Sequence, residues 1–525
     1  MNTTTLNTNT INRYKIFLAS LSGLLLTLAC PKSGLFWLAW CALVPLLLAL
    51  RNISPQNGFY LGFCSGLTHY LTLVYWLVPT MKTYGHLPLY LSLVVLILLS
   101  AYLALYVAAF STIVIRLGST PSLFFVIIPC LWVALEYLRT LLFTGFPWEL
   151  LGYTQYNILP LIQVSDILGV YGVSFCIVLG NAAICLVFLY LTGKGWQSST
   201  VTKRLAVGSI FSFAAILGLV WLYGTWRIHT IDNMSADAPR VKVTIVQGNI
   251  DQAIKWNPAY QQASTLKYIK LSLKAKQKKP DLIVWPETAT PFYFLSNTRL
   301  SGLVLQGMQE SGADFLIGSP SLRSGQQGTE YYNSAYLVGP KGNVYGRYDK
   351  AHLVPFGEYV PLKKWLPFID KIVIGAGDFR PGKKGRTIPW GKYRLGIQIC
   401  YEIIFPDLAR AMAQNNAALL VNITNDAWYG RSSAPYQHFS MTIFRAVENR
   451  RALIRAANTG ISGFVDPAGR INAATPLFED ALLTHSVPLL QATTCYTQFG
   501  DLFAMFCLAA TLFVALLGIR HWKRK

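Results

Sequence analysis

The chain has 525 residues, of which 53% are hydrophobic and only 13% are charged, and its formal net charge is +22. Soluble domains carry about 25% charged residues, so this composition excludes a disordered protein, a coiled coil and an ordinary soluble enzyme. The long uncharged stretches lie within residues 14–223 and 501–519, whereas the sequence between them has the composition of a water-soluble domain. We therefore expect a membrane protein with one large domain outside the membrane.

Eight apolar blocks are candidates for membrane-spanning helices, because a span needs roughly 20 apolar residues. They lie at residues 14–30, 34–50, 57–79, 88–115, 122–138, 164–192, 205–223 and 501–519. The first block could instead be a signal peptide that ends in a lipoprotein cleavage site at Cys30. Thr27 and Leu28 fit such a site poorly, and another apolar block follows at once, so we favour eight retained spans.

The positions of Lys and Arg predict the orientation of these spans, because cytoplasmic segments are enriched in positive charge. If the N-terminus is cytoplasmic, the short segments on that side hold Arg13, Lys15, Arg51, Arg116, Lys194, Lys203, Arg204, Arg520, Lys523, Arg524 and Lys525. The opposite short loops hold only Lys32, Lys82 and Arg139. We therefore expect both termini in the cytoplasm and three parts: a seven-span domain at 1–227, an outward-facing domain at 228–495, and an eighth span with a basic tail at 496–525.

The outward-facing domain carries a cluster of lysines in one predicted helix, namely Lys267, Lys270, Lys274, Lys276, Lys278 and Lys279. A solvated helix face explains such a cluster, and attraction to anionic lipid head groups is the alternative. Nucleic acid is not expected as a partner, because the predicted topology places this domain outside the cytoplasm.

The nine cysteines favour catalysis over cross-linking. All except Cys400 and Cys495 lie in the apolar blocks, where cysteine behaves as a small apolar residue. These two could form a disulfide in an oxidising compartment, although Cys495 lies close to the last apolar block. Cys400 is the thiol that needs an explanation.

Residues 241–499 alternate strand-like and helix-like segments, which is typical of a layered α/β domain. The predicted strands are Val241–Ile245, Leu282–Trp285, Phe315–Ile317, Tyr336–Val338, Leu395–Ile399, Leu419–Ile423 and Ile461–Val465. The predicted helices lie near residues 258–279, 299–312, 406–415 and 435–450. The sequence contains no Gly-rich phosphate loop and no metal-spaced Cys/His cluster, so we expect neither a cofactor nor a metal.

Three segments share one form, in which an apolar strand ends in a reactive side chain. Glu287 follows Leu282–Pro286, Lys350 follows Tyr345–Asp349, and Cys400 follows a strand that ends at Ile399. Strand ends at one edge of an α/β domain are where catalytic groups collect.

A glutamate, a lysine and a cysteine form a workable catalytic set. The thiolate would be the nucleophile, and a nearby lysine would lower the pKa of the thiol. The glutamate can take the thiol proton, and the ammonium can stabilise an oxyanion. Taken singly, each residue also fits an ordinary role, since such a cysteine is usually core and such charged side chains are usually solvated.

Several ordered motifs resemble the nitrilase superfamily, and the chain as a whole resembles the bacterial apolipoprotein N-acyltransferases. The nitrilase-like motifs are Trp285–Ala289, Tyr348–Pro361 and Ile399–Glu402. Further matching stretches are Gln247–Ile250 with Lys255-Trp256, Thr424–Gly430, and Thr144–Gln155. The stretch Thr144–Gln155 lies outside the nitrilase-like part, so it separates this family from soluble nitrilases.

The resemblance implies a four-layer αββα sandwich attached to eight spans, facing the periplasm from the inner membrane of a bacterium. It implies that a phospholipid donates an acyl chain to a cysteine thioester, and that the α-amine of an S-diacylglyceryl cysteine of an apolipoprotein then accepts it. A monomer is the family expectation. Matched by motif, the catalytic residues would be Cys400 as nucleophile, Glu287 as general base and Lys350 as oxyanion stabiliser.

The resemblance also implies supporting roles for residues near the triad. Glu358 would support Lys350 or act as a second carboxylate. Tyr401 and Glu402 would line the site, and Trp256 would contact the lipid substrate. The aromatic segments 365–368 and 428–429 are candidates for lids that keep water from the thioester. Anchoring of these aromatic residues at the membrane interface is an equally good explanation.

Two other functions remain open at this stage. A membrane-tethered amidase could use the same cysteine to hydrolyse a C–N bond, although hydrolysis of a soluble amide needs no bilayer. A non-catalytic lipid transporter or receptor with a degenerate nitrilase fold would not need to keep Glu287, Lys350 and Cys400 together.

Overall fold

The computed structural model describes residues 11–117, 121–197, 199–325, 328–360 and 379–522. Two compact units are present. The first unit comprises Met1–Val78, Leu89–Thr225 and Asp501–Lys525, and the second comprises Pro79–Pro88 and Trp226–Gly500.

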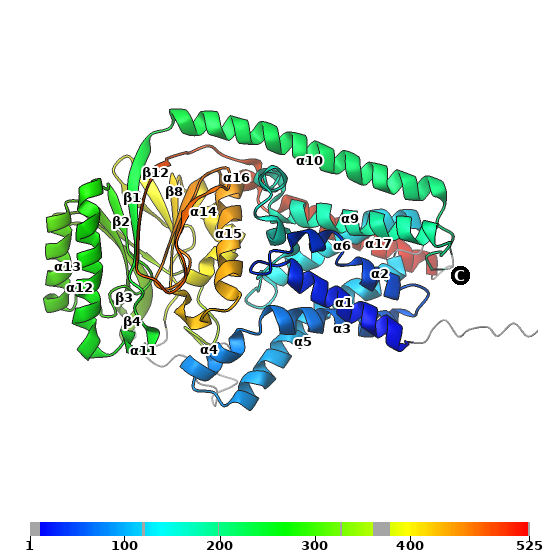
Figure 1. The fold of residues 1–525 in the computed structure, drawn as a ribbon, viewed down its shortest axis with the longest axis horizontal. Helices are drawn as coiled ribbons and strands as arrows, with labels where there is room; N and C mark the ends of the chain where they lie inside the picture. The colour runs from blue at the N-terminus through cyan, green and yellow to red at the C-terminus, as the bar shows by residue number, and fades with distance from the viewer. Residues whose placement is uncertain (1–10, 118–120, 198, 326–327, 361–378, 523–525) are drawn as a thin grey trace, which may run out of the picture. The chain divides into compact units, whose positions relative to one another are not determined.

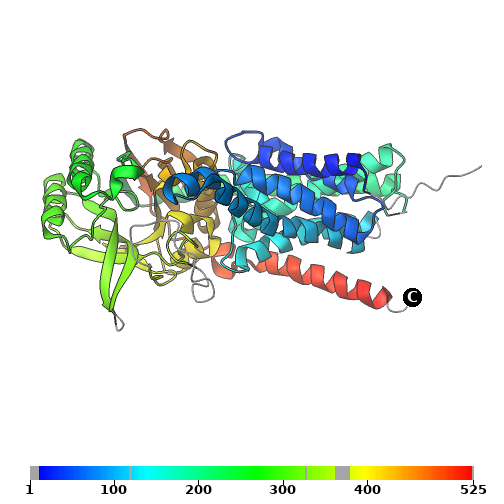
Figure 2. The ribbon, with the colours of Figure 1, turned by 90° about the horizontal axis from the view of Figure 1, so that it is seen from below.

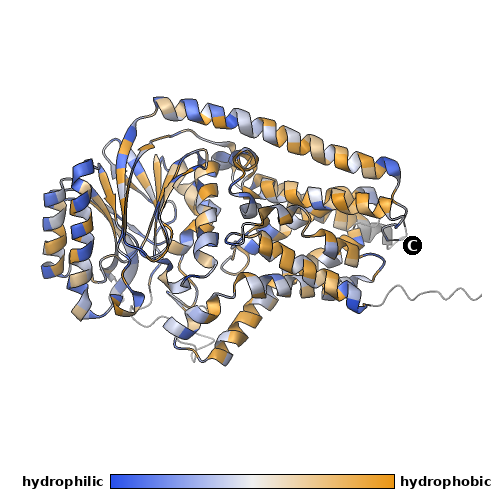
Figure 3. Ribbon diagram, in the orientation of Figure 1, coloured by the Kyte–Doolittle hydropathy of each residue, from blue (hydrophilic) through white to orange (hydrophobic). Residues whose placement is uncertain are grey.

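The first unit consists of apolar helices (Figure 1). They are α1 (Arg13–Ala29), α2 (Val44–Ala49), α3 (Pro55–Leu73), α5 (Leu89–Leu117), α6 (Pro121–Leu141), α7 (Leu159–Ile162), α8 (Ser165–Leu168), α9 (Val170–Leu191), α10 (Lys203–Asp237, which continues into the second unit) and α17 (Leu502–Trp522), with the short 3-10 helices η1 (Phe36–Trp40) and η2 (Leu151–Gln155). Figure 3 shows hydrophobic residues along most of the length of α5 and α9, and α17 packs mainly on α6.

Four helices of the described residues are long and apolar enough to cross a membrane, namely α5, α6, α9 and α10. The block predicted at 57–79 forms two helices, α3 and α4 (Leu77–Tyr84), which are bent by 49° relative to each other and would make a fifth span if counted together. The blocks at 14–30, 34–50 and 501–519 form shorter or broken apolar helices. Four or five spans therefore meet the length criterion, rather than the eight expected from hydropathy alone.

A buried carboxylate holds the loop that precedes α7. Oε1 of Glu136, near the end of α6, accepts hydrogen bonds from the backbone N–H of Leu151 at 2.7 Å and from Nε1 of Trp132 at 3.0 Å. Nη1 of Arg139, one turn later, donates to the hydroxyl of Tyr70 on α3. The bond satisfies the N–H of Leu151 and one carboxylate oxygen without water, so Glu136 fixes the position of η2 inside the helical unit.

The second unit contains two six-stranded sheets that face each other (Figures 1 and 2). The first has the order β12-β1-β2-β3-β4-β5 and the second the order β11-β10-β9-β8-β7-β6. The strands are β1 (Arg240–Gln247), β2 (Leu282–Val284), β3 (Asp314–Gly325), β4 (Gly328–Val338), β5 (Val344–Asp349), β6 (Thr387–Trp390), β7 (Tyr393–Ile399), β8 (Leu419–Thr424), β9 (Ala452–Ala457), β10 (Gly463–Val465), β11 (Ile471–Ala474) and β12 (Ala481–Pro488). Figure 2 shows β3 and β4 extending as a long hairpin.

Helices cover both outer faces of the two sheets, which completes the predicted αββα sandwich. Figure 1 shows α12 (Pro258–Ala275) and α13 (Thr298–Ser311) on one face, and α14 (Pro406–Gln414) and α15 (Ala434–Asn449) on the other. The remaining short helices are α11 (Gln252–Lys255), η3 (Lys276–Lys278), η4 (Cys400–Ile404), η5 (Asp426–Tyr429) and α16 (Cys495–Phe499). All four helices predicted for this domain are confirmed, and each predicted strand overlaps an observed one.

Parallel strands lie at the centre of each sheet. β2 is parallel to β1 and β3, and β8 is parallel to β7 and β9, whereas the outer pairs are antiparallel. Because parallel strands end at the same edge, the segments that follow β7 and β8 leave their sheet side by side. The segment that follows β2 leaves the other sheet at the carboxyl ends of its parallel strands.

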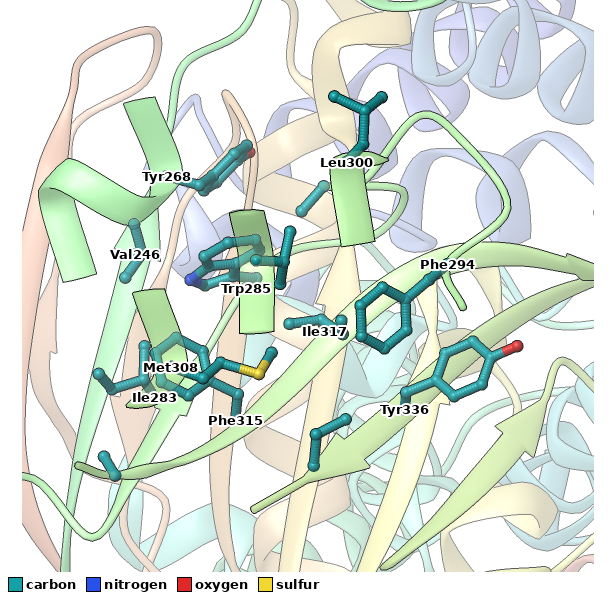
Figure 4. Close-up of a cluster of buried hydrophobic side chains, with 14 of the residues drawn as sticks. Val246, Tyr268, Ile283, Trp285, Phe294, Leu300, Met308, Phe315, Ile317 and Tyr336 are labelled. Atoms are coloured by element: carbon teal, nitrogen blue, oxygen red, sulfur yellow. The ribbon is translucent and has the colours of Figure 1, made fainter. Parts of the chain in front are cut away.

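A hydrophobic cluster under α12 and α13 fixes the end of β2 (Figure 4). Trp285 lies in this cluster, and its Nε1 donates to Oγ of Ser272 at 2.8 Å. Gly318 on β3 allows the chain after Trp285 to pass closely, since a Cβ there would lie 2.4 Å from the carbonyl oxygen of Pro286. The residue after Pro286 is thus placed by tight packing on both sides.

Candidate active site

Three reactive side chains follow strands whose carboxyl ends point to one edge. Glu287 lies after β2, Lys350 after β5, and Cys400 begins η4 directly after β7. β5 runs in the same direction as β2, because β4 is antiparallel to both β3 and β5. The structure therefore brings together the strand ends that the sequence singled out.

Lys350 joins two carboxylates in a buried cluster. Its Nζ lies 2.9 Å from Oε2 of Glu358 and 4.0 Å from Oε1 of Glu287. Nδ2 of Asn333, on β4, donates to Oε1 of Glu287 at 2.8 Å and to Oε1 of Glu358 at 2.9 Å. Lys350 is only 1% exposed, so charge and hydrogen bonds replace its lost hydration.

The surrounding charges keep Lys350 protonated. Burial by itself lowers the pKa of its ammonium, but the carboxylates of Glu358 and Glu287 outweigh burial and raise this pKa above its ordinary value. A lysine that stays charged in a desolvated site can stabilise negative charge that develops on a substrate oxygen.

The pKa of the Cys400 thiol is raised overall, although the neighbouring Lys350 lowers it. The pKa of this thiol is raised to about 12, mainly by burial and then by Glu287. Lys350 lowers this pKa, as predicted, but desolvation outweighs the attraction of one ammonium. The resting group is a neutral thiol at neutral pH, so attack requires a base that removes its proton.

Glu287 has an oxygen available for such a proton. Its Oε1 faces Asn333 and Lys350, whereas its buried Oε2 has no hydrogen-bond partner among the described residues. Oε2 of Glu136 is likewise buried without a donor among the described residues, so the position of Glu287 beside Lys350 is what distinguishes it. The arrangement suits a group that accepts a proton during a reaction.

The backbone of Cys400 is held in a strained conformation. Its φ is +53°, a region that costs a residue with a Cβ about 1 to 3 kcal/mol. Its carbonyl oxygen accepts hydrogen bonds from Nε2 of His438 at 3.2 Å and from Nδ2 of Asn422 at 3.4 Å. These two donors lie on α15 and β8, so the turn at Cys400 is braced by the sheet and by the helix that covers it.

His438 belongs to a fully buried network. Nη2 of Arg455 lies 2.8 Å from Nδ1 of His438 and donates to Oδ2 of Asp426 at 2.9 Å. Burial, and then the charge of Arg455, lower the pKa of His438 against the opposing effect of Asp426. Nε2 of His438 donates to the Cys400 carbonyl, and Nδ1 lies between Arg455 and Oδ1 of Asp426, which is 3.0 Å away.

Glu402 braces the backbone beside two of the three reactive residues. Its Oε1 accepts from the N–H of Ala351 at 2.7 Å, and its Oε2 accepts from the N–H of Ile399 at 2.7 Å. Burial is the main reason that its pKa is raised, to about 7. The contacts join the segment after Lys350 to the strand end before Cys400.

Tyr401 lies in a small aromatic group rather than in the ion cluster. Its ring packs against Phe405 with a centroid distance of 5.2 Å and lies 6.0 Å from the ring of His352. Burial raises the pKa of its hydroxyl.

The loop that holds Trp428 is secured by a segment from far earlier in the chain. Oγ1 of Thr80 donates to the carbonyl of Trp428 at 2.8 Å, and the hydroxyl of Tyr84 donates to the carbonyl of Ala427 at 3.1 Å. The Tyr84 and Trp428 rings meet edge to face at 4.9 Å. α4 and η5 therefore form one packed element of the second unit, which hydropathy did not indicate.

The other predicted aromatic residues are less tightly placed. Trp256 is the C-terminal cap of α11, directly after Lys255, and is partly exposed. The candidate lid at residues 365–368 lies outside the described residues.

Cys495 is exposed and Cys400 is buried, and both thiols are free, so the disulfide considered between them is not formed. In the part of the chain that the structure describes, no group of three His, Cys, Asp or Glu side chains could hold a metal ion.

Comparison with known proteins finds two family models along the chain. Residues 22–183 match the apolipoprotein N-acyltransferase N-terminal domain, and residues 242–495 match carbon-nitrogen hydrolase. The apolipoprotein N-acyltransferase of Geobacter metallireducens is 46% identical over 97% of this chain and 96% of its own length. That of Haemophilus influenzae is 32% identical, with 97% of each chain covered.

The chain belongs to the apolipoprotein N-acyltransferase family. Among solved structures, a variant of an amidase of the nitrilase superfamily from Nesterenkonia is 21% identical, with a TM-score of 0.36, and covers 50% of this chain and 96% of its own. The resemblance found in the motifs is thus confirmed, and the match over residues 22–183 places the chain with N-acyltransferases rather than with free-standing carbon-nitrogen hydrolases.

Sequence reasoning missed several residues of this N-acyltransferase site. Asn333 bridges two carboxylates, and Asn422 and His438 hold the Cys400 carbonyl. Asn422 is an amide inside the otherwise apolar run Leu419–Ile423, and a polar residue at a core position is the signal that could have identified it; β4 around Asn333 is mixed in polarity and gives no such signal. His438 lies in a predicted helix with no such signal.

Replacing His438 by phenylalanine should slow thioester formation by about tenfold, because one hydrogen bond to the strained Cys400 carbonyl is lost and Arg455 is left with fewer partners. His438→Gln, which keeps a donor, should recover part of the rate. Single-turnover release of lysophospholipid measures this effect, and His485→Gln on β12 is the matched control. An unchanged rate in His438→Phe, in folded protein, would show that Asn422 alone holds the carbonyl.

Proposed function

We propose that this N-acyltransferase moves a fatty acyl chain from a phospholipid, through a thioester on Cys400, to the α-amine of the S-diacylglyceryl cysteine of apolipoproteins. Membership in the family supports the reaction, and the buried cluster of Glu287, Lys350 and Glu358 beside Cys400 supports the assignment of residues. The observation that carries the proposal is the pairing of a neutral buried thiol with a carboxylate oxygen that no described residue occupies.

In the first half-reaction, Glu287 takes the thiol proton as Sγ of Cys400 attacks the ester carbonyl carbon of the phospholipid. Lys350 stabilises the resulting oxyanion. The C–O bond of the ester then breaks, and Glu287 returns the proton to the departing alkoxide. The products are a thioester and a lysophospholipid.

In the second half-reaction, the neutral α-amine of the acceptor attacks the thioester carbonyl, and Glu287 takes a proton from the attacking nitrogen. Lys350 again stabilises the oxyanion, the C–S bond breaks, and the leaving thiolate regains the proton from Glu287. An amide and the free thiol result. Hydrolysis is avoided only if water is kept from the thioester.

The remaining predicted residues take supporting roles in this scheme. Glu358 holds Lys350, as their 2.9 Å ion pair suggests. Glu402 and Tyr401 shape the walls around the turn at Cys400. Trp256 and Trp428 contact the lipid chains, and the link from α4 to the Trp428 loop is where a lipid-facing segment would reach the site.

We further propose eight membrane spans, with the shorter helices of the first unit counted as complete spans in a tightly packed bundle. The enzyme then lies in the inner membrane with both termini in the cytoplasm. The seven-span part is residues 1–227, the periplasmic catalytic domain is 228–495, and the eighth span with its basic tail is 496–525. It acts as a monomer on two lipid substrates. Short apolar helices can span where neighbours and a locally thinner bilayer accommodate them.

The test is a reconstituted transfer with purified enzyme, one phospholipid of defined acyl chains, and a synthetic S-diacylglyceryl cysteinyl peptide. We expect a peptide heavier by one acyl chain and an equal amount of lysophospholipid, measured by mass spectrometry. An ether-linked phospholipid, which has no ester to attack, is the control. Hydrolysis of small amides without any acyl transfer would contradict the proposal and favour the amidase.

A further inference from the structure

A second buried lysine lies against the proposed catalytic base. Lys255 ends α11 and is 2% exposed. Its Nζ donates to the backbone carbonyl of Glu287 at 3.1 Å. The carboxylate of Glu287 is the main charge that stabilises this ammonium, and Cys400 contributes when it is a thiolate.

The short helix that carries Lys255 is fixed by buried amides at the ends of two strands. Nδ2 of Asn425, after β8, donates to Oε1 of Gln252 on α11 at 2.6 Å. Nδ2 of Asn458, after β9, donates to the carbonyl of Ile250 at 2.8 Å, just before α11. A four-residue helix has little stability of its own, so these contacts with the second sheet set the direction of Lys255.

An ammonium buried this deeply needs compensation, because desolvation of a charge is expensive unless opposite charges and hydrogen bonds replace water. Burial is the main reason that the pKa of Lys255 is lowered, to about 8, and Glu287 and Cys400 oppose this lowering. One carbonyl is a weak partner for a full charge. The negative charges of the active site supply the rest.

Lys255 also balances the charges of the ion cluster. Lys350 is the near partner of Glu358 at 2.9 Å and reaches Glu287 only at 4.0 Å. With Lys255 included, two buried ammonium groups balance the two carboxylates, and Lys255 reaches Glu287 through the backbone carbonyl of that residue. Without it, a surplus negative charge would oppose formation of a thiolate.

We propose that Lys255 is a positioning residue of this active site, a second ammonium that keeps Glu287 ionised and stabilises the thiolate of Cys400 as it attacks. The proposal rests on the acyl-transfer function proposed above. Lys255 neither gains nor loses a proton in either half-reaction. Its charge stabilises the thiolate that forms when the thiol proton passes to Glu287, and it is retained when that proton passes to the leaving alkoxide.

Other ionisable groups share this edge of the two sheets, and each belongs to a different contact. They are Lys350 with Glu358, the network of Asp426, His438 and Arg455, the buried Glu402, and the exposed Asp251 that caps α11. Glu287 and Cys400 are the groups that act on the ammonium of Lys255, so its removal should be felt first at the thiol and the base.

The test measures alkylation of Cys400 by iodoacetamide between about pH 6 and about pH 10, a range that brackets the pKa of Lys255. Full-length enzyme is used as wild type, Lys255→Met, Lys255→Arg and Lys270→Met, the last being an exposed lysine of α12 and the matched control. Peptide mass spectrometry separates Cys400 from the other cysteines. Single-turnover release of lysophospholipid is measured in the same preparations.

We expect Lys255→Met to alkylate about tenfold more slowly than wild type below pH 8, since loss of a nearby opposite charge raises a thiol pKa by about one unit or more. The difference should close at higher pH, where wild-type Lys255 loses its own charge. Lys255→Arg, which stays charged, should keep its advantage over Lys255→Met up to pH 10. A purely structural role would not produce this pH dependence.

Profiles of Lys255→Met and wild type that coincide at every pH would overturn the inference, even if acyl transfer falls. If Lys255→Met does not fold, the pH dependence of Lys255→Arg relative to wild type decides, because only the wild-type rate should lose its electrostatic advantage near pH 8. Normal alkylation profiles with no lysophospholipid released by wild type would contradict the proposed function and leave the electrostatic role of Lys255 intact.

Discussion

Replacing Cys400 by alanine is expected to abolish acyl transfer, by more than about a thousandfold, while the catalytic unit stays folded. The thiol is the proposed site of the covalent intermediate, so no other buried group nearby can take its place. The contacts that hold the turn are made by the Cys400 carbonyl with His438 and Asn422, and these do not depend on the side chain. Intact-mass analysis with a defined phospholipid should show a hydroxylamine-labile acyl adduct in wild type and none in Cys400→Ala.

The strained backbone gives this prediction a second, independent part. Cys400→Gly should be equally inactive but more stable than Cys400→Ala by about 1 kcal/mol, since glycine adopts a positive φ without strain. Thermal unfolding in detergent measures the difference. Cys495→Ala, at an exposed position on α16, is the control and should form the adduct normally. An adduct that persists in Cys400→Ala would place the nucleophile elsewhere.

Replacing Glu287 by glutamine is expected to have opposite effects on two reactions of the same thiol. Thioester formation should fall by about 10² to 10⁴, because the general base is lost. Alkylation of Cys400 by iodoacetamide should become faster, because the charge of Glu287 contributes to the raised pKa of the thiol. The glutamine side chain has the same shape as the native glutamate, so its amide oxygen can still accept the hydrogen bond from Asn333. Peptide mass spectrometry and single-turnover release of lysophospholipid measure the two rates.

Divergence of these two rates would identify Glu287 as the group that moves the proton. If alkylation and thioester formation fall together, Glu287 holds the structure of the site and another group acts as the base. Glu310→Gln, at an exposed position on α13, is the matched control and should leave both rates unchanged.

Much of what was predicted about the α/β domain and its candidate site rests on hydropathy and on the residues at strand ends. The alternation of β-rich and helical segments correctly gave the layered α/β domain, because side-chain periodicity follows directly from backbone geometry. Strand ends singled out Glu287, Lys350 and Cys400, and the structure places Nζ of Lys350 4.0 Å from Oε1 of Glu287; the catalytic roles of the three residues stay a prediction.

Hydropathy was a weaker guide to the membrane helices. The block at 57–79 meets the composition of one span, but it forms two helices, α3 and α4, with a bend of 49° between them. Residues of α4 then pack against the Trp428 loop, through Thr80 and Tyr84. Composition reports how apolar a segment is and contains no information about which distant loop it will contact.

The sequence by itself determined the family and the layered fold and singled out the three residues proposed to react, because these follow from local patterns and ordered motifs. Only the tertiary structure decided the protonation state of Cys400, the bridging role of Asn333 and the position of Lys255. A pKa depends on the summed effect of burial and every nearby charge, so one neighbouring lysine could not predict it. Lys255 meets Glu287 only because amides after β8 and β9 hold α11, and contacts between strands so far apart in the chain exist only once the two sheets have packed.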